Sequence, residues 1–401
     1  MKLGILGGSF NPVHLGHLFL ANSAISALNL DRVVFVPAFC SPFKTEAEGM
    51  TEEGTGNRLD MLAAAVSSDH RFAIDSCEIK RQGVSYTIDT LEDIIARFLP
   101  QGKPYLIIGD DLAADLPKWN QYEKILELAV IAIARRKTNT AVKHPFPCVY
   151  IENEIMNISS QMIRQKIKDN DIKGSDWHSL VPSAVSAIIQ DRRLYGCSSN
   201  SSAALAFGSD KIYDSVIQKV EAAARETLTI ERFLHSRNTA LHAYDMCSRF
   251  GLDPAAGYLA GIAHDLAKQL DNKQILKIIK SERIPVSSLE KNKPNLLHGK
   301  AAAVLLRDRF SIHNEDVLEA VACHTSGNEK MGALAKVIYI ADKTESSRNI
   351  DPALRIMCRE ADLDSILFAV LEKTIMKLKA KELDLSKDTI MLLNKIKEKK
   401  T

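Results

Sequence analysis

The sequence has neither a strong net charge nor a long apolar run. Its 401 residues carry 52 Lys and Arg against 50 Asp and Glu, a formal net charge of +2. No broad electrostatic attraction to nucleic acid or to a membrane surface is therefore expected. The longest apolar run, near Leu128–Ala134, is far too short to span a bilayer. We expect neither nucleic acid nor a membrane as a partner.

Cysteines are few and scattered. The seven cysteines form no Cys-x-x-Cys pair, and an odd number fits reduced thiols better than a disulfide framework. The chain begins on a strand-like segment rather than a secretion signal. These features predict a cytoplasmic protein. A length of 401 residues predicts two or three domains, and the sequence leaves the assembly state open, a homo-oligomer included.

The most informative stretch of the first half runs from Leu3 to Leu20, LGILGGSFNPVHLGHLFL. Its first residues predict a buried strand, and Gly7-Gly8 is expected to turn the chain sharply beside a ligand, with no side chain in the way. His14 and His17 follow on one face of an amphipathic helix that begins there. A strand, a glycine turn and a helix N-terminus suit a phosphate, because free N–H groups and the helix dipole face the anion.

The remaining apolar segments of the first half predict strands alternating with helices. Strands are expected at Arg32–Pro37, Phe72–Ile74, Glu78-Ile79, Tyr105–Ile108 and Val130–Ala134. A helix is expected at Arg58–Val66. Ligands of an open α/β sheet bind at the carboxyl ends of the strands. Asp110 and Asp111 would stand at that edge, where carboxylates hold Mg²⁺, contact ribose or cap a helix.

Two motifs resemble the signatures of the HxGH nucleotidyltransferases. Gly7–His17 is similar to GGxFxPxHxGH, and Ile158–Arg164 (ISSQMIR) is similar to ISSxxIR, about 140 residues later and in the expected order. Alone, the second motif would be a serine helix cap beside an unrelated arginine. That superfamily joins the α-phosphate of a nucleotide to a second phosphate, releases pyrophosphate and has a Rossmann-like sheet.

Two further segments resemble the nicotinate mononucleotide adenylyltransferase branch. They are Ser85–Leu91 (SYTIDTL) and Leu116–Trp119 (LPKW). The resemblance implies that Tyr86, Thr87 and Trp119 bind the mononucleotide. Helix capping by Thr87 or Asp89 and a core position for Trp119 are the alternatives that the residues themselves leave open.

The resemblance covers residues 1–196 and implies an α/β Rossmann-like domain that uses ATP with Mg²⁺. The attacking phosphate is already anionic, so the protein need only align it with the α-phosphorus and neutralise charge developing on pyrophosphate. The residues implied for catalysis are His14, His17, Lys44 and Arg164. Those implied for ATP are Gly7, Gly8, Ser9, Phe10, His17, Gly109, Asp111, Ile158, Ser159, Ser160 and Arg164. Relatives usually carry histidine where this chain has Phe43. A module that binds ATP without transfer is the alternative.

The two halves are joined by a serine-rich segment, Cys197–Asp210, that is low in charge. We expect a linker over 197–211 and a second domain over 212–401. From Ile212 onward the pattern is helical almost throughout, so the second domain is predicted to be all-α.

The second half carries an ordered series of histidines and aspartates within about 110 residues. The series is His235, His264, Asp265, His298, His324 and Asp342. Four histidines and two carboxylates can hold two divalent metals with one carboxylate bridging, and this mixed set suits iron or manganese more than magnesium. An isolated His-Asp pair would be weak support, so the prediction depends on the whole series.

The series and its flanking residues resemble the HD-domain phosphohydrolases over about 212–385. The segments RFLHS, AGIAHDLAK, LLHG, HTSG and YIADK resemble those of the branch that splits diadenosine tetraphosphate into two ADP. The resemblance implies that Asp265 and the metals activate water, and that Lys268 holds a phosphate. A general nucleotide phosphohydrolase and a non-catalytic nucleotide sensor are the alternatives. The expected substrates of the whole chain are ATP, nicotinate mononucleotide and diadenosine tetraphosphate.

Overall fold

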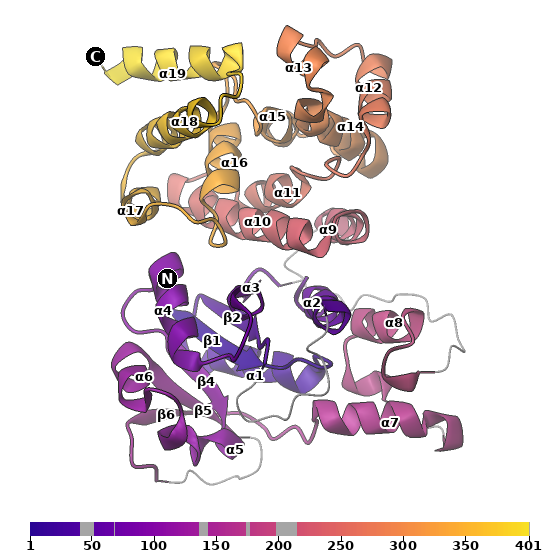
Figure 1. Ribbon diagram of the computed structural model, residues 1–401, viewed down its shortest axis with the longest axis vertical. Helices are drawn as coiled ribbons and strands as arrows, with labels where there is room; N and C mark the ends of the chain where they lie inside the picture. The colour runs from indigo at the N-terminus through magenta and orange to yellow at the C-terminus, as the bar shows by residue number, and fades with distance from the viewer. Residues whose placement is uncertain (41–51, 68, 136–142, 174–176, 198–214, 401) are drawn as a thin grey trace. The chain divides into compact units, whose positions relative to one another are not determined.

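The computed structural model of the chain describes residues 1–40, 52–67, 69–135, 143–173, 177–197 and 215–400. The chain divides into two compact units, Met1–Asp210 and Lys211–Thr401, and each is described by itself (Figure 1). Within the described residues, no helix has the length and apolar character needed to cross a membrane. All but Cys197 of the expected linker lies outside the described residues.

A six-stranded sheet with the order β3-β2-β1-β4-β5-β6 forms the centre of the first unit. The strands are β1 Leu3–Gly8, β2 Arg32–Pro37, β3 Phe72–Ile74, β4 Tyr105–Gly109, β5 Val130–Ala134 and β6 Cys148–Ile151. Every neighbouring pair is parallel. The strand order reverses between β1 and β4, and the carboxyl ends of strands at such a switch point are where open α/β sheets bind ligands. The α/β fold predicted from the sequence is confirmed.

Helices lie between these strands and after the last of them (Figure 1). They are α1 Leu15–Leu28, α2 Glu52–Val66, α3 Cys77–Arg81, α4 Thr87–Phe98, α5 Asp110–Ala113, α6 Tyr122–Leu128, α7 Ser160–Lys173 and α8 Ser183–Asp191. Three short 3₁₀ turns are η1 Leu116–Lys118, η2 His178–Leu180 and η3 Leu194–Gly196. Because α1 follows β1 and α5 follows β4, the N-termini of these two helices lie at the edge of the sheet where ligands bind.

Two local predictions in this unit are wrong. Glu78 and Ile79 lie in α3 rather than in a strand, because the Asp75 carboxylate accepts the Cys77 N–H at 2.9 Å and turns the chain into a helix. The glycine pair does not make the turn, since both glycines belong to β1 and the left-handed residue is Phe10, with φ of 47°. A Cβ on Gly8 would lie 3.1 Å from the Phe10 ring, so this glycine makes room for the ring instead.

The second unit contains helices and no strand among its described residues, as predicted. The helices are α9 Ser215–Thr227, α10 Ile230–Phe250, α11 Pro254–Ala263, α12 Asn272–Ser281, α13 Ser288–Asn292, α14 His298–Phe310, α15 Glu315–Cys323, α16 Ala333–Thr344, α17 Pro352–Glu360, α18 Leu363–Ala380 and α19 Lys387–Lys400, with the 3₁₀ turn η4 Pro294–Leu297 before α14. The buried side chains of α10, α11 and α16 form the centre of this unit.

Two glycines of the second unit allow close helix packing. A Cβ on Gly261 of α11 would lie 2.5 Å from Cα of Ala240 on α10. A Cβ on Gly299 of α14 would lie 2.8 Å from the carbonyl oxygen of Val321 on α15 and 2.9 Å from the His324 ring. Protein interiors are close-packed, so a methyl group at either position would force the helices apart. Both glycines therefore bring histidine-bearing helices together.

Candidate functional sites

The two sequence motifs of the first unit meet in space. At the start of α7, the Ser160 hydroxyl donates to the Pro12 carbonyl at 2.9 Å. One turn later, the Arg164 guanidinium donates to the Asn11 carbonyl at 2.7 Å. The Ser159 hydroxyl accepts the Met162 N–H at 3.1 Å and so caps this helix. The loop after β1 is thus tied to the N-terminus of α7, about 150 residues away.

The histidine pair lies at the N-terminus of α1. His14 is the N-cap residue with extended backbone, so the two histidines do not share a helical face in the strict sense, yet their rings stack with centroids 3.7 Å apart. The His14 N–H donates to Nδ1 of His17 at 3.2 Å. In the neutral ring the proton is then on Nε2, which makes His17 a donor to anions. A Cβ on Gly16 would lie 3.0 Å from the His14 ring, so the spacing needs glycine there.

Two residues that support this loop were missed from the sequence. Arg58 of α2 is 3% exposed, and its Nη1 donates to the carbonyls of Ser9 at 2.9 Å and Ala38 at 2.6 Å. It therefore joins the ends of β1 and β2. The Tyr195 hydroxyl donates to Oδ1 of Asn11 at 2.5 Å. Neither side chain has a sequence feature that distinguishes it, because both act through backbone or loop atoms far along the chain.

The other expected residues of this unit lie at the same edge of the sheet. Gly109 ends β4 and caps α5, and Asp111 lies in α5. Thr87 begins α4, whose N-cap is Tyr86, and no side chain caps that helix, so the capping alternative is wrong. Trp119 follows η1 and is half-buried, while Trp177 is the fully buried tryptophan. Lys44 and Phe43 lie outside the described residues.

The acidic group formed by Asp75, Cys77 and Asp93 is an ion-pair cluster. Arg97 donates to both oxygens of Asp75 at 2.6 and 2.9 Å and to Asp93 at 2.8 and 3.0 Å. Burial, together with Asp75, raises the pKa of the Cys77 thiol. A protonated thiol and carboxylates already neutralised by arginine make a poor metal site.

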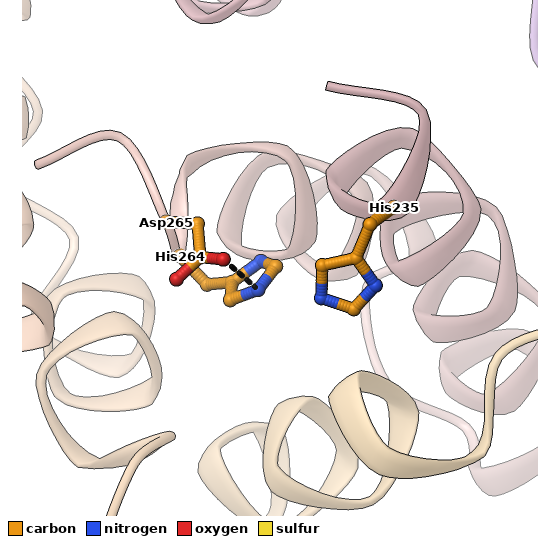
Figure 2. A group of neighbouring side chains, drawn as sticks. All are labelled: His235, His264 and Asp265. Atoms are coloured by element: carbon orange, nitrogen blue, oxygen red, sulfur yellow. Dashed lines mark ion pairs between the residues drawn. The ribbon is translucent and has the colours of Figure 1, made fainter. Parts of the chain in front are cut away.

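The second unit brings the whole histidine and aspartate series together. His235 lies in α10, His264 and Asp265 follow α11, His298 begins α14, His324 follows α15 and Asp342 lies in α16. Figure 2 shows His235 and His264 directed toward one another beside Asp265. Oδ2 of Asp265 lies 3.6 Å from Nε2 of His264, and its Oδ1 lies 3.0 Å from Nε2 of His298. One carboxylate therefore faces both halves of the cluster.

Asp342 completes the half of the cluster that contains His235. Its Oδ1 lies 3.1 Å from Nε2 of His235 and 3.7 Å from Nε2 of His264. In the other half, Nε2 of His298 and Nε2 of His324 are 3.0 Å apart. The four histidines and Asp265 are buried, and the Asp342 side chain is 16% exposed. The six residues thus form one compact donor set.

In three of the histidines, a hydrogen bond from Nδ1 to the backbone determines that Nε2 is the nitrogen that faces the other members of the donor set. Nδ1 donates to the carbonyl three residues earlier in His264 (2.7 Å), His298 (2.7 Å) and His324 (2.8 Å). Carbonyls near helix termini are free for such bonds. Because a carbonyl can only accept, Nδ1 carries the proton and Nε2 carries a lone pair. This outer bond is the usual arrangement of a metal-binding histidine.

These donor atoms fit a metal centre. The Nε2 atom of His264 is buried without a hydrogen-bond partner, and the Nε2 atoms of His298 and His324 face one another with lone pairs. Burial holds the pKa of His264 below its usual value and that of His324 well below it, which keeps these rings neutral. Buried lone pairs that face one another are costly unless a cation lies between them.

At His235 the partner of Nδ1 is a side chain rather than a backbone carbonyl, and it was not predicted from the sequence. Its Nδ1 lies 3.1 Å from Oε1 of Glu345, a fully buried carboxylate. Glu345 also accepts from the N–H and hydroxyl of Ser347. A buried carboxylate behind a ligating histidine fixes its ring and raises its basicity. Glu345 lies three residues after Asp342, so one short segment supplies both a carboxylate of the donor set and the carboxylate behind His235.

Four cations surround the cluster. They contact its donor atoms as follows: Arg232 to Asp265 (2.9 Å), Lys268 to His298 (3.1 Å), Lys343 to Asp342 (3.2 Å) and Arg348 to Asp342 (3.1 Å). Burial would raise the pKa of Asp265, but the positive charge beside it, that of Lys268 included, lowers that pKa below its usual range. The carboxylates are therefore ionised. Four cations exceed the three carboxylates Asp265, Asp342 and Glu345, so added metals would make this centre strongly positive.

Comparisons with known proteins give the class of each half. Residues 5–166 match the family model described as cytidylyltransferase-like, and residues 232–347 match the HD domain. A probable nicotinate-nucleotide adenylyltransferase of Borreliella burgdorferi is 36% identical over 49% of this chain and 97% of its own length. One of Treponema pallidum is 38% identical over 49% of this chain and 99% of its own.

Solved structures match each half separately. A predicted HD superfamily hydrolase involved in NAD metabolism from Clostridium acetobutylicum is 30% identical, covering 45% of this chain and 96% of its own, with a TM-score of 0.43. The nicotinic acid mononucleotide adenylyltransferase of Plasmodium falciparum is 22% identical over 49% of this chain and 98% of its own, with a TM-score of 0.40. The two family models show that the chain is a nucleotidyltransferase-type domain fused to an HD domain. Its first half belongs to the nicotinate-nucleotide adenylyltransferase family.

Proposed function

We propose that the first unit transfers the adenylyl group of ATP to nicotinate mononucleotide. A phosphate oxygen of the mononucleotide attacks the α-phosphorus of ATP, a new P–O bond forms, and the bond to the β-phosphate breaks to release pyrophosphate. The observation that carries this proposal is the junction of the two motifs, where Ser160 and Arg164 bind the loop that precedes His14 and His17. The named activity of relatives that match over nearly their full length supports it.

In this reaction, the residues of the chain bind and neutralise phosphates. The stacked pair His14 and His17 lies at a helix N-terminus, where N–H donors stabilise negative charge that grows on the leaving pyrophosphate. Arg164 adds a fixed positive charge at the same loop. Mg²⁺, bound with ATP, would neutralise further charge on the phosphates. No general base is required, because the attacking phosphate is already ionised.

This first proposal predicts equal amounts of dinucleotide and pyrophosphate. The full chain is incubated with ATP, Mg²⁺ and nicotinate mononucleotide, and both products are measured by chromatography and a coupled phosphate assay. A parallel reaction contains nicotinamide mononucleotide instead. Transfer to the nicotinate form is the expected result. ATP binding without pyrophosphate release would reduce the unit to a binding module, and use of the nicotinamide form alone would contradict the proposed acceptor.

We propose that the second unit is a metal-dependent phosphohydrolase that splits diadenosine tetraphosphate into two ADP. His235, His264, Asp265, His298, His324 and Asp342 would hold two divalent metals, iron or manganese, whose chemistry is to activate water and neutralise phosphate charge. Asp265 faces both halves of the donor set. The excess of cations over carboxylates at this centre is the observation that favours a polyphosphate over a monophosphate.

The products of cleavage test this second proposal. The manganese- or iron-loaded full chain is mixed with diadenosine tetraphosphate, and the nucleotides are separated over time. We expect ADP alone, because hydrolysis at the central bridge leaves two phosphates on each adenosine. ATP and AMP in equal amounts would keep the hydrolase and overturn the symmetric cleavage. Faster turnover of mononucleotides would favour a general phosphohydrolase, and metal binding with no cleavage of any nucleotide would favour a sensor.

A further inference from the structure

Two cationic side chains of the second unit contact histidine nitrogens whose lone pairs would be needed to bind a metal. Nζ of Lys268 lies 3.1 Å from Nε2 of His298, and Nη2 of Arg348 lies 3.1 Å from Nε2 of His235. Both cations are donors only, so each contact uses the Nε2 lone pair of a neutral imidazole. At His235 the ring proton is then on Nδ1, which faces Glu345, and the Asp342 carboxylate lies 3.1 Å from the same Nε2. His235 and His298 belong to opposite halves of the donor set, so each half contains one such contact.

Neither contact can persist once a metal is bound. A neutral imidazole has one lone pair on Nε2, and this lone pair serves either as a hydrogen-bond acceptor or as a metal ligand. A divalent ion would also repel an ammonium or guanidinium group at such a distance. The Lys268 side chain is 32% exposed and that of Arg348 is 42% exposed, so both have room to withdraw toward solvent. Their long stems permit this movement without a change of backbone.

The displaced cations would still lie beside the metals. Lys268 lies 3.8 Å from Oδ1 of Asp265, and Arg348 lies 3.1 Å from Oδ1 of Asp342, so both are anchored to the carboxylates of the centre. Nε of Arg348 also donates to the Asp342 carbonyl at 3.0 Å, which holds the base of the guanidinium in place. A guanidinium and an ammonium released from histidine nitrogens are well suited to phosphate oxygens.

We propose that Lys268 and Arg348 are place-holding cations, which stabilise the metal-free centre and bind the phosphates of the substrate after metals displace them. The metals then bind first and the polyphosphate second, because the metals release the two cationic side chains that hold the polyphosphate. This inference rests on the proposed polyphosphate hydrolase and adds the exchange of roles. The inference predicts that replacing either cation raises the affinity for metal and lowers the affinity for the polyphosphate.

The test measures both affinities in Lys268→Met and Arg348→Gln. The full chain is stripped of metal and titrated with Mn²⁺ by calorimetry. The Mn²⁺-loaded chain is then titrated with a methylene-bridged analogue of diadenosine tetraphosphate, which cannot be hydrolysed at that bridge. We expect Mn²⁺ to bind about tenfold more tightly to each variant and the analogue about tenfold more weakly, the range of one charge-assisted hydrogen bond. Lys300→Met and Arg307→Gln, which alter surface ion pairs of α14, serve as matched controls and should change neither affinity.

The direction of the two changes decides the outcome. Variants that bind both Mn²⁺ and the analogue more weakly would show a merely structural role and overturn the inference, as would variants with unchanged Mn²⁺ affinity. The thermal midpoint confirms that each variant is folded, and adenylyl transfer by the same preparations reports that the first unit is intact. If the unaltered chain bound neither Mn²⁺ nor the analogue, the proposed hydrolase itself would fall, and the inference with it.

Discussion

Replacing Asp265 by asparagine is expected to abolish phosphohydrolase activity and leave adenylyl transfer unchanged. Asp265 is the single carboxylate that faces both halves of the donor set. An amide keeps the shape but loses the negative charge, so neither metal would be held correctly. Metals supply several kcal/mol of transition-state stabilisation, and the loss is expected to be about 10³-fold in rate, because about 1.4 kcal/mol corresponds to tenfold.

A control variant and two further measurements distinguish loss of hydrolysis from loss of folding. Asp308→Asn, a surface change in the same unit next to Arg307, is the control and should keep full activity. Metal content after dialysis, measured by mass spectrometry, should fall in Asp265→Asn and not in the control. The thermal midpoint reports the fold of the altered unit, and the adenylyl transfer rate reports that the first unit is intact. Asp265→Asn that retained a tenth of the rate with its metals in place would remove Asp265 from the bridging role.

The sequence predicted which residues of the second unit would meet but not how they are held. The histidines and aspartates could be recognised because their types and order suit metal ligation. Glu345 could not, since its importance depends on facing His235 across about 110 residues of chain. Arg232 and Arg348 were missed for the same reason, as charged residues of helices and connecting segments look alike in sequence. The metal role of the six residues stays a prediction.

In the first unit, strands buried on both faces were predicted well, because continuous apolar runs bounded by turns are characteristic of parallel sheets. Glu78-Ile79 was assigned wrongly because two residues carry no periodicity, and the Asp75 side chain decides the local structure. The turn at Phe10 was also missed, since a left-handed conformation at a phenylalanine is not expected from sequence. Arg58, which joins two strand ends, has no local pattern at all.

Replacing His17 by alanine is expected to lower kcat for adenylyl transfer by about 10²- to 10³-fold, the usual cost of removing one donor to a developing anion. His17 lies in the first turn of α1, and its Nδ1 is held by the His14 N–H. That bond directs the proton to Nε2, so the side chain donates where negative charge grows. KM for ATP should change little, because the charge develops in the transition state and not in the bound substrate.

A matched control and a conservative variant sharpen this prediction. His144→Ala, at a histidine bonded to Tyr150, removes an imidazole from the same unit and should keep the rate. His17→Asn retains a donor group and should recover part of the lost rate. Hydrolysis by the second unit, measured in the same sample, reports that the preparation is intact. A variant that raised KM and kept kcat would place His17 in ground-state binding, since an interaction made equally with substrate and transition state leaves kcat unchanged.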